Sequence, residues 1–188
     1  NNIFANTSSS TSAYCFYHIG GTLDSNYNDF YCPNGAKTGY YNGDRSTLVD
    51  WQSGTSQDTN SIQADPNFAD AELRIGNSSF CQERGVGGLG VTLDFEGNTR
   101  ATPPDIGADE NSTTYTPTTL SGPYDVGSGK TYSTLKAAAA DLSLRGQSGA
   151  VTFDAYAGTY TDTTSLGAVS GNNSTRTITL RKAPSESG

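Results

Sequence analysis

The chain has 188 residues, and its 11 basic and 19 acidic side chains give a formal net charge of −8 at pH 7. A negative surface repels phosphate backbones and anionic membranes, so this balance argues against nucleic-acid and membrane-surface partners. Hydrophobic residues make up 33% of the chain, methionine is absent, and glycine and tyrosine number 22 and 11. This composition favours an extracellular protein that is rich in strands and turns and poor in helix.

The length allows one or two domains, and no apolar run approaches the roughly 18 residues that a membrane-spanning helix needs. Membrane insertion is therefore not expected. Tyrosine, phenylalanine and β-branched residues recur in short alternating clusters. Disordered chains are depleted in these residues, so an ordered β-rich chain is favoured over a disordered one.

The first part of the chain, residues 1–101, predicts a series of short strands separated by Gly, Asn, Asp and Pro. We expect these strands at residues 2–5, 13–19, 27–32, 38–41, 48–51, 61–64 and 91–95. Strands this short must stack, either in a sandwich or in a solenoid whose successive coils share one core. Irregular spacing and long polar turns favour the solenoid.

Six stretches in this part set aliphatic and aromatic residues among Asn and Asp: NNIFAN at 1–6, SNYNDFY at 25–31, DTNSI at 58–62, DPNF at 65–68, VTLDFEG at 91–97 and PDIGADE at 104–110. In this order they resemble the last coils and the C-terminal end of right-handed parallel β-helix domains with the pectin-lyase-like fold. The resemblance implies that Ile and Phe stack inside while Asn side chains bond between coils. It also implies a structural role for the last stretch, in which Ile106 plugs the final coil and Asp105 and Asp109 cap turns or pair with Arg100.

The second part of the chain follows a Thr-rich stretch at 111–121 that predicts a linker. Residues 132–146 form the one convincing helix, with Thr131 or Ser133 as its N-cap and Gly146 as its terminator. Strands are expected at 150–156 and 177–180. This arrangement resembles the cap helix and first coils of another β-helix. The predicted domains are therefore one β-helix end at 1–110, a linker at 111–121, and the start of a second β-helix at 122–188.

Three motifs that look like chemistry have simpler interpretations. The run GSGKT at 127–131 lacks the first glycine of a phosphate-binding loop. The run GVGGLG at 85–90 precedes a predicted strand, whereas dinucleotide binding requires a helix there. His18 is the only histidine, and a packed or turn histidine is favoured over a zinc ligand or a catalytic triad. No cofactor is expected.

The carboxylates are the remaining catalytic candidates, since glycosidases use paired Asp or Glu residues. Asp105, Asp109 and Glu110 cluster in the sequence, but they lie at a predicted domain end, where a structural role is favoured. No catalytic residue is assigned. Asp-rich turns offer the oxygen ligands that Ca²⁺ prefers, but no 12-residue calcium loop is present, so no residue is assigned to a metal.

Three cysteines leave an odd count for pairing. Cys15 and Cys32 lie 17 residues apart, close to the length of one short coil, so a disulfide between them in an oxidising exterior is one prediction. Buried thiols are the equal alternative. Cys81 is then unpaired or buried.

Tandem β-helix domains joined by Thr and Pro linkers are similar to large repetitive surface proteins and adhesins of bacteria, notably of the Bacteroidota type. The first hypothesis is therefore a structural or adhesive segment of an extracellular surface protein, without enzymatic activity, that assembles head to tail with other copies through open β-helix ends. One alternative is the non-catalytic end of a polysaccharide lyase or glycosidase. Another is a carbohydrate-binding module that stacks aromatic rings on surface glycans; its candidates are Tyr14, Tyr17, Tyr27 and Tyr31 and above all Tyr40, Tyr41 and Trp51.

Overall fold

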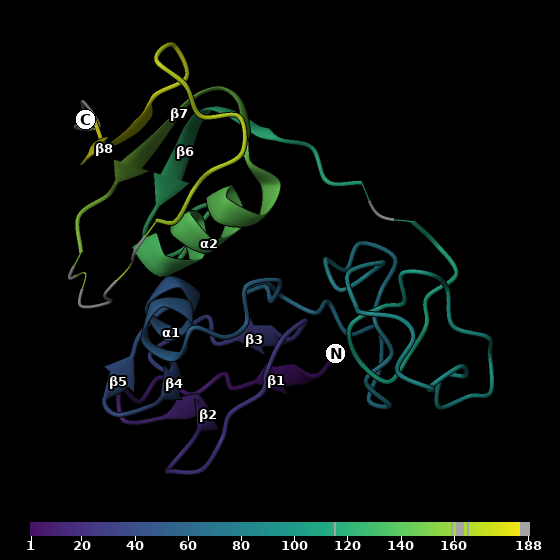
Figure 1. Cartoon of the computed structure of the whole chain (residues 1–188). Helices are drawn as coiled ribbons and strands as arrows, with labels where there is room; N and C mark the ends of the chain where they lie inside the picture. Colours follow the sequence, from purple (N-terminus) through teal and green to yellow (C-terminus); the bar gives the residue numbers. More distant parts are fainter. Residues whose placement is uncertain (115, 159, 161–163, 165, 185–188) are drawn as a thin grey trace. The chain divides into compact units, whose positions relative to one another are not determined.

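A computed structural model describes residues 1–114, 116–158, 160, 164 and 166–184 of the chain (Figure 1). The chain divides into two compact units, Asn1–Pro117 and Thr118–Gly188. This division lies within the stretch 111–121 that the sequence marks as a linker. None of the described helices is both long and apolar enough to cross a membrane.

The first unit contains five short strands and one helix: β1 (Ile3–Ala5), β2 (Tyr14–Tyr17), β3 (Asp29–Tyr31), β4 (Lys37–Tyr40), β5 (Asp44–Arg45) and α1 (Leu48–Thr55). β1 pairs in parallel with β3 and forms a two-stranded sheet. β2 pairs in parallel with β4, and β5 adds to β4 in the antiparallel direction. The strands predicted at 2–5, 13–19 and 27–32 are thus confirmed with shorter bounds, and the strand predicted at 38–41 is confirmed one residue earlier.

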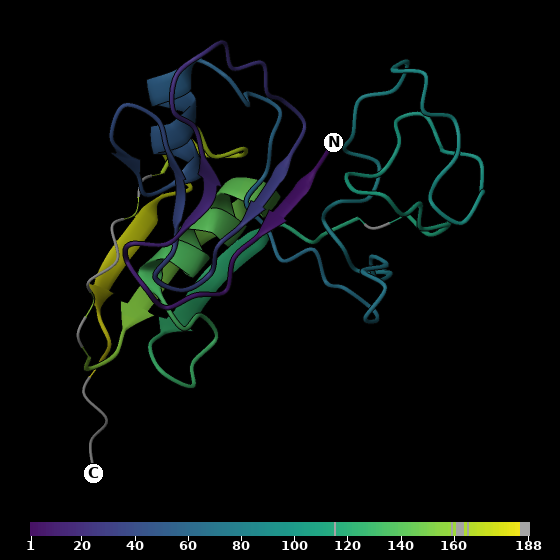
Figure 2. The same ribbon diagram turned by 90° about the horizontal axis from the view of Figure 1, so that it is seen from below.

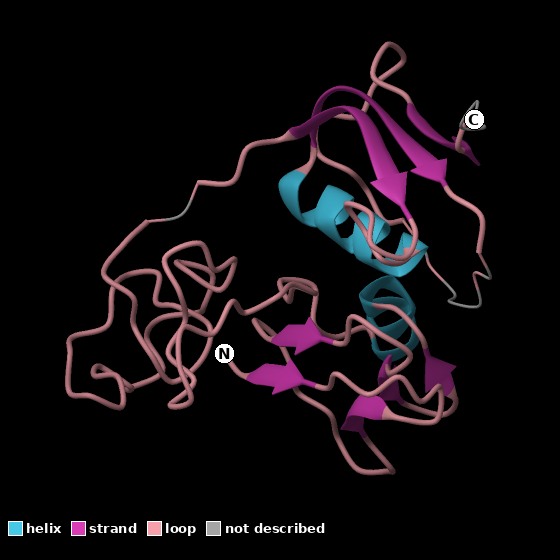
Figure 3. Cartoon of the chain, turned by 180° about the vertical axis from the view of Figure 1, so that it is seen from behind, coloured by secondary structure: helices cyan, strands magenta, loops and turns pink. Residues whose placement is uncertain are grey.

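The rest of the first unit, from residue 56 onward, consists largely of loops and turns (Figure 3). The strand expected at 61–64 is reduced to a parallel bridge between Asp29 and Ile62. The strand expected at 91–95 is reduced to an antiparallel bridge between Leu93 and Thr99. Asp65 and Pro66 end the first stretch, and closely spaced glycines flank the second, so neither forms a ladder.

The prediction of a right-handed parallel β-helix is wrong. The described residues form small separate parallel and mixed sheets, with no solenoid and no closed sheet. Two features explain the difference. The strands of the first unit have two to four residues, and the chain reverses at β5 to give an antiparallel pair where a β-helix would continue in parallel. The assignment of 1–110 and 122–188 to two β-helices is therefore also wrong.

Helix α1 forms where a strand was expected at 48–51, because Thr47 and Asp50 exchange two hydrogen bonds at its N-terminus. The hydroxyl of Thr47 accepts a hydrogen bond from the Asp50 amide at 3.1 Å, and the Asp50 carboxylate accepts one from the Thr47 amide at 3.1 Å. This reciprocal pair satisfies two helix N-terminal donors. Ser56 ends the helix in the left-handed region at φ 55°. The helix thereby turns Trp51 into the core.

Four aromatic side chains form the core of the first unit, and we call them the aromatic core: Phe4, Phe16, Phe30 and Trp51. Their ring centroids lie 5.1 to 5.8 Å apart in successive contacts. Phe30 and Trp51 are fully buried. Gly39 of β4 makes room for them, because a Cβ atom there would lie 2.5 Å from the Trp51 ring.

The second unit is a three-stranded parallel sheet with a helix packed on one face (Figures 1 and 2). Its elements are β6 (Leu120–Val126), α2 (Leu135–Arg145), β7 (Gln147–Ala155) and β8 (Ile178–Lys182), with strand order β6-β7-β8. The core brings together residues from the helix and two of the strands: Leu120, Val126, Ala138, Leu142, Val151 and Phe153.

The structure confirms the predicted helix, its terminator Gly146 and both predicted strands of this unit. The N-cap is Thr134, whose hydroxyl accepts from the Ala137 amide, and not Thr131 or Ser133. β6 was not expected, because Gly122 and Pro123 within it are typical of a turn. Proline is tolerated here because β6 is an edge strand.

Candidate functional site

Three tyrosines of β2 and β4 form a partly exposed aromatic surface, which we call the tyrosine surface: Tyr14, Tyr17 and Tyr40. The parallel register places Tyr17 directly opposite Tyr40 and Tyr14 opposite Lys37. Successive residues of a strand point to opposite faces, so Phe16 enters the aromatic core while Tyr17 points outward. Alternation accounts for Phe16 and Tyr17, whereas Tyr14 at the start of the strand contacts Tyr17 and Tyr40 although it lies two residues before Phe16.

The rings of Tyr17 and Tyr40 are stacked, with centroids 4.7 Å apart and planes inclined by 15°. Tyr14 meets both rings edge-on, with centroid distances of 5.2 Å to Tyr17 and 5.9 Å to Tyr40. These are favourable geometries for aromatic pairs and hold the rings in place. Tyr17 remains 54% exposed, so aromatic area is available to a ligand.

Charged groups flank the tyrosine surface. The Tyr14 hydroxyl donates to the Asp44 carboxylate at 2.7 Å, and the Lys37 ammonium lies 2.9 Å from the same carboxylate. The hydrogen bond to Asp44 raises the pKa of Tyr14 to about 12. Hydrogen bonds from Tyr14 and then Lys37 lower the pKa of Asp44. At neutral pH the site therefore presents a neutral phenol, a carboxylate and an ammonium group.

This combination suits a carbohydrate ligand. The C–H face of a sugar ring packs on an exposed aromatic ring, and its hydroxyl groups need nearby donors and acceptors. Asp44 supplies an acceptor and Lys37 a donor beside the stacked rings. Their mutual contacts fix them in position before a ligand arrives, which limits the entropy lost on binding.

The structure separates the three residues that the sequence favoured for sugar stacking. Tyr40 belongs to the tyrosine surface. Tyr41 is half-buried, stacks on His18 with centroids 5.6 Å apart and meets Trp51 edge-on. Trp51 is fully buried, so it cannot stack on a ligand. Lys37 and Asp44 were not identified from the sequence, because only the pairing of β2 with β4 and β5 brings them to Tyr14.

Cys15 and Cys32 are thiols in the structure, and no disulfide joins them. The Cys15 thiol donates to the Tyr31 carbonyl with a sulfur–oxygen distance of 3.5 Å, and the Cys32 thiol donates to the Phe30 carbonyl at 3.6 Å. Cys32 is buried, as is Cys81. Both thiols thus have hydrogen-bond partners within the first unit, and the disulfide between them stays a prediction.

An acidic cluster forms the second candidate, since oxygen atoms of Asp94, Glu96 and Asp109 lie within 4.8 Å of one another. Each carboxylate already has protein partners. Asp94 accepts from the Glu96 and Asn98 amides, Asp109 accepts from the Ile75 amide, and Glu96 lies 2.6 Å from the Arg74 guanidinium. Burial would raise the pKa of Asp94, but these hydrogen bonds outweigh it and leave the pKa lowered. These carboxylates therefore have a structural role: they hold backbone amides of the surrounding turns, and Arg74 is the counter-ion of Glu96.

The stretch 104–110 has the structural role that the sequence predicted. Ile106 is fully buried, and the Asp105 carboxylate accepts from the amides of Glu83 and Asn111 at 2.7 and 2.8 Å. Arg100 lies 3.6 Å from Glu110 and donates to the carbonyls of Asp105 and Gly107. The carboxylate that pairs with Arg100 is thus that of Glu110, whereas Asp105 accepts from Arg100 through its backbone carbonyl.

The glycine-rich motifs have structural partners as well. Lys130 of the run at 127–131 lies with its ammonium 3.7 Å from the centroid of the Tyr156 ring, a cation–π contact. The run at 85–90 is followed by a loop, which lacks the helix N-terminus that a pyrophosphate needs.

Comparison with family models, curated proteins and solved structures finds no match for this chain. The tyrosine surface is the candidate site that combines exposed aromatic area with flanking charges.

Proposed function

We propose that this chain is a non-catalytic, glycan-binding segment of an adhesive extracellular protein. The observation that carries the proposal is the stack of Tyr17, which is 54% exposed, on the half-buried Tyr40 beside Asp44 and Lys37. Exposed aromatic rings with fixed polar neighbours are a common means of recognising amphipathic ligands. The net charge of −8 favours neutral glycans over polyanionic ones.

Catalysis is less well supported than binding. The carboxylates that the sequence offered for acid–base chemistry hold backbone amides or pair with arginines. Glycoside hydrolysis uses two carboxyl groups that flank a bound sugar. Asp44 is instead the single carboxylate in the set of contacts described for the tyrosine surface. This arrangement fits retention of a sugar better than cleavage of one.

Replacing Tyr17 with alanine should weaken glycan binding about tenfold, because one stacked aromatic ring contributes about 1.4 kcal/mol. A glycan array identifies the ligand, and titration calorimetry then measures the dissociation constant. Phe95→Ala is the matched control, because Phe95 is 50% exposed against 54% for Tyr17 and lies outside the tyrosine surface. Absence of binding to any glycan would contradict the proposal, as would equal losses in the two variants.

A further inference from the structure

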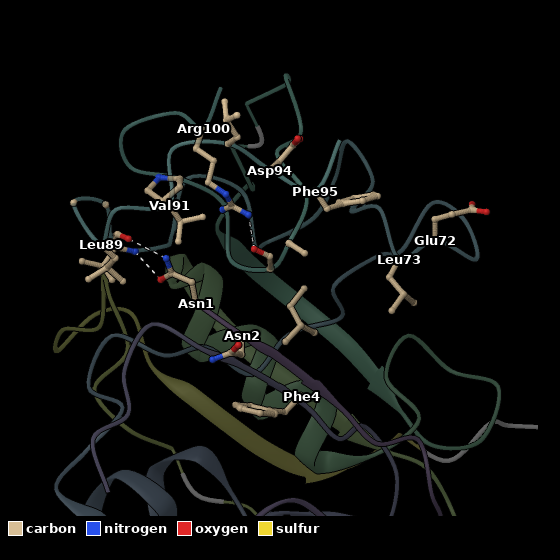
Figure 4. Close-up of a pocket in the computed structure, with 18 of the residues that line it drawn as sticks. Asn1, Asn2, Phe4, Glu72, Leu73, Leu89, Val91, Asp94, Phe95 and Arg100 are labelled. Atoms are coloured by element: carbon tan, nitrogen blue, oxygen red, sulfur yellow. Dashed lines mark hydrogen bonds between the residues drawn. The ribbon is translucent and has the colours of Figure 1, made fainter. Parts of the chain in front are cut away.

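The first unit contains an open groove with a volume of about 850 Å³ (Figure 4). We call it the apolar groove and define it by six of its lining side chains: Phe4, Leu73, Leu89, Val91, Leu93 and Phe95. Five of these six, all except Phe4, are 50 to 69% exposed. Large apolar side chains gathered around one groove commonly mark an interaction site.

Strand β1 runs along this groove, since its residues Ile3 and Phe4 and the preceding Asn2 line it. Among the described strands β1 has one neighbour, β3, so its second edge carries backbone groups that no strand pairs. The amide of Gly107 reaches the first residue only, at the Asn1 carbonyl. An exposed strand edge is a template for another strand. The groove thus combines an edge for backbone pairing with apolar surface for side chains.

A buried donor lines the same groove. The Arg100 side chain is 8% exposed, and its Nε atom has no hydrogen-bond partner within the described residues. Leaving a buried N–H group without an acceptor is unfavourable. Figure 4 shows Arg100 among the side chains around the groove, with its terminal nitrogen bonded to the Gly107 carbonyl.

The second unit carries a strand with matching properties. β8 is the last strand in the order β6-β7-β8, so its outer edge also lacks a strand neighbour among the described residues. Its residues from Thr179 to Lys182 are exposed, and Leu180 is 58% exposed. β8 is therefore an edge strand with an apolar side chain that is available for packing.

The charges of the two units favour pairing of the first unit of one copy with the second unit of another copy. The first unit holds 14 acidic and 5 basic residues, whereas the second holds 5 acidic and 6 basic residues. Arg176, Arg181 and Lys182 lie in or beside β8, and Asp154 pairs with one of them, Arg181. Glu72 and Asp94 line the groove of the first unit. Opposite net charges steer such surfaces together.

We propose that β8 of one copy adds to the unpaired edge of β1 in a second copy and seats Leu180 in the apolar groove. This is strand addition between two different surfaces of the same chain. Because each copy keeps one β8 and one groove, the contact is heterologous and extends head to tail. It uses edges of ordinary sheets, not β-helix ends, and it does not depend on glycan binding.

Sedimentation of the full chain over a wide range of protein concentration tests the contact. We expect the mean mass to rise with concentration and the association to weaken with added salt. Val91→Asp in the groove and Leu180→Asp in β8 should each weaken association at least tenfold. Ile19→Asp and Leu166→Asp are the matched controls, because these residues are also exposed and lie outside both surfaces. They should associate like the unchanged chain.

A mixture of the two variants is the sharper test. Val91→Asp retains an intact β8 and Leu180→Asp retains an intact groove, so an equimolar mixture should form dimers and no longer chains. Circular dichroism checks that each variant folds, and Leu180→Lys replaces Leu180→Asp if the aspartate disturbs the second unit, because an edge lysine also opposes strand addition. A monomer at every concentration would overturn the proposal. So would variants that associate normally, or a mixture that stays monomeric.

Discussion

Replacing Trp51 with alanine is expected to destabilise the first unit by about 4 kcal/mol, since truncation of a buried tryptophan removes apolar contacts and leaves a cavity. Trp51 is fully buried and contacts Phe16, Phe30 and Tyr41 with ring-centroid distances of 5.6 to 6.5 Å. Trp51 lies on helix α1, which begins at the N-cap Thr47. One substitution therefore weakens most of the aromatic core.

A polar contact adds to the loss. The Trp51 indole nitrogen donates to the carboxylate of Asp58 at 2.7 Å, and Asp58 is 1% exposed. Asn28 and Ser61 also donate to this carboxylate, at 2.9 and 2.6 Å. Without the indole, a buried carboxylate loses one of its three side-chain donors. This is unfavourable because a buried charge needs its hydrogen bonds.

Urea unfolding followed by circular dichroism measures the effect. Trp51→Phe separates the two contributions, because it keeps a ring in the core and removes the indole donor, and we expect a loss of about 2 kcal/mol. Ile19→Ala, at a residue that is 77% exposed, should change the free energy of unfolding by less than about 0.5 kcal/mol. A loss below about 1 kcal/mol for Trp51→Ala would show that the aromatic core does not hold the unit together.

The strands with alternating aromatic residues were predictable because their pattern is local. Phe16 enters the aromatic core and the next residue, Tyr17, is exposed, while residues around Phe30 are buried on both faces. Helix α1 was missed because Leu48 and Val49 are typical of a strand. Thr47 and Asp50 could have indicated the start of this helix from the sequence. They form a capping box in which Asp50 takes the N3 position that Glu or Gln usually occupies.

The resemblance to a β-helix failed at long range. Its short motifs correspond to real local features, such as the parallel pair of β1 and β3 and the buried Ile106. A solenoid also requires each coil to stack on the next over its whole length. The loops that contain Phe68, Leu93 and Thr99 form single antiparallel bridges instead. Local motifs do not determine that outcome.

The candidate surfaces were predictable only in part. The exposed ring of Tyr17 follows from strand alternation, whereas the positions of Lys37 and Asp44 depend on strand register. The apolar groove is built from loop residues such as Leu73, Leu89 and Phe95. Loops have no periodicity from which their contacts can be inferred, so this groove became visible only in the structure.

The second large effect concerns Asp29, a fully buried carboxyl group in β3. One of its oxygens accepts from the Ala64 amide at 2.9 Å, and the other accepts from the Cys81 thiol with a sulfur–oxygen distance of 3.5 Å. Burial raises the pKa of Asp29 to about 7, although these two hydrogen bonds oppose the shift. Cys32 and Asp65 are the other titratable groups that raise its pKa.

A raised pKa fixes the direction of the pH dependence. The folded chain retains the Asp29 proton up to about pH 7, whereas the unfolded chain releases it near pH 4. The stabilisation is fully present below about pH 4 and is lost as the pH rises through about 7. Asp44, Asp70 and Asp94 act in the opposite sense, because their lowered pKa values contribute stability that is lost on acidification.

Asp29→Asn isolates the contribution of Asp29 to the pH dependence, because asparagine has the same shape and stays neutral. The contributions of Asp44, Asp70 and Asp94 are present in both proteins and cancel in the comparison. We expect similar free energies of unfolding near pH 4 and a variant that is more stable near pH 8 by as much as about 4 kcal/mol. Urea unfolding at pH values between these limits measures the difference. Asp24→Asn, at an exposed position, should show no such widening. A constant difference across the pH range would mean that Asp29 is ionised within the folded core, in which case Ala64 and Cys81 would have to stabilise a buried charge.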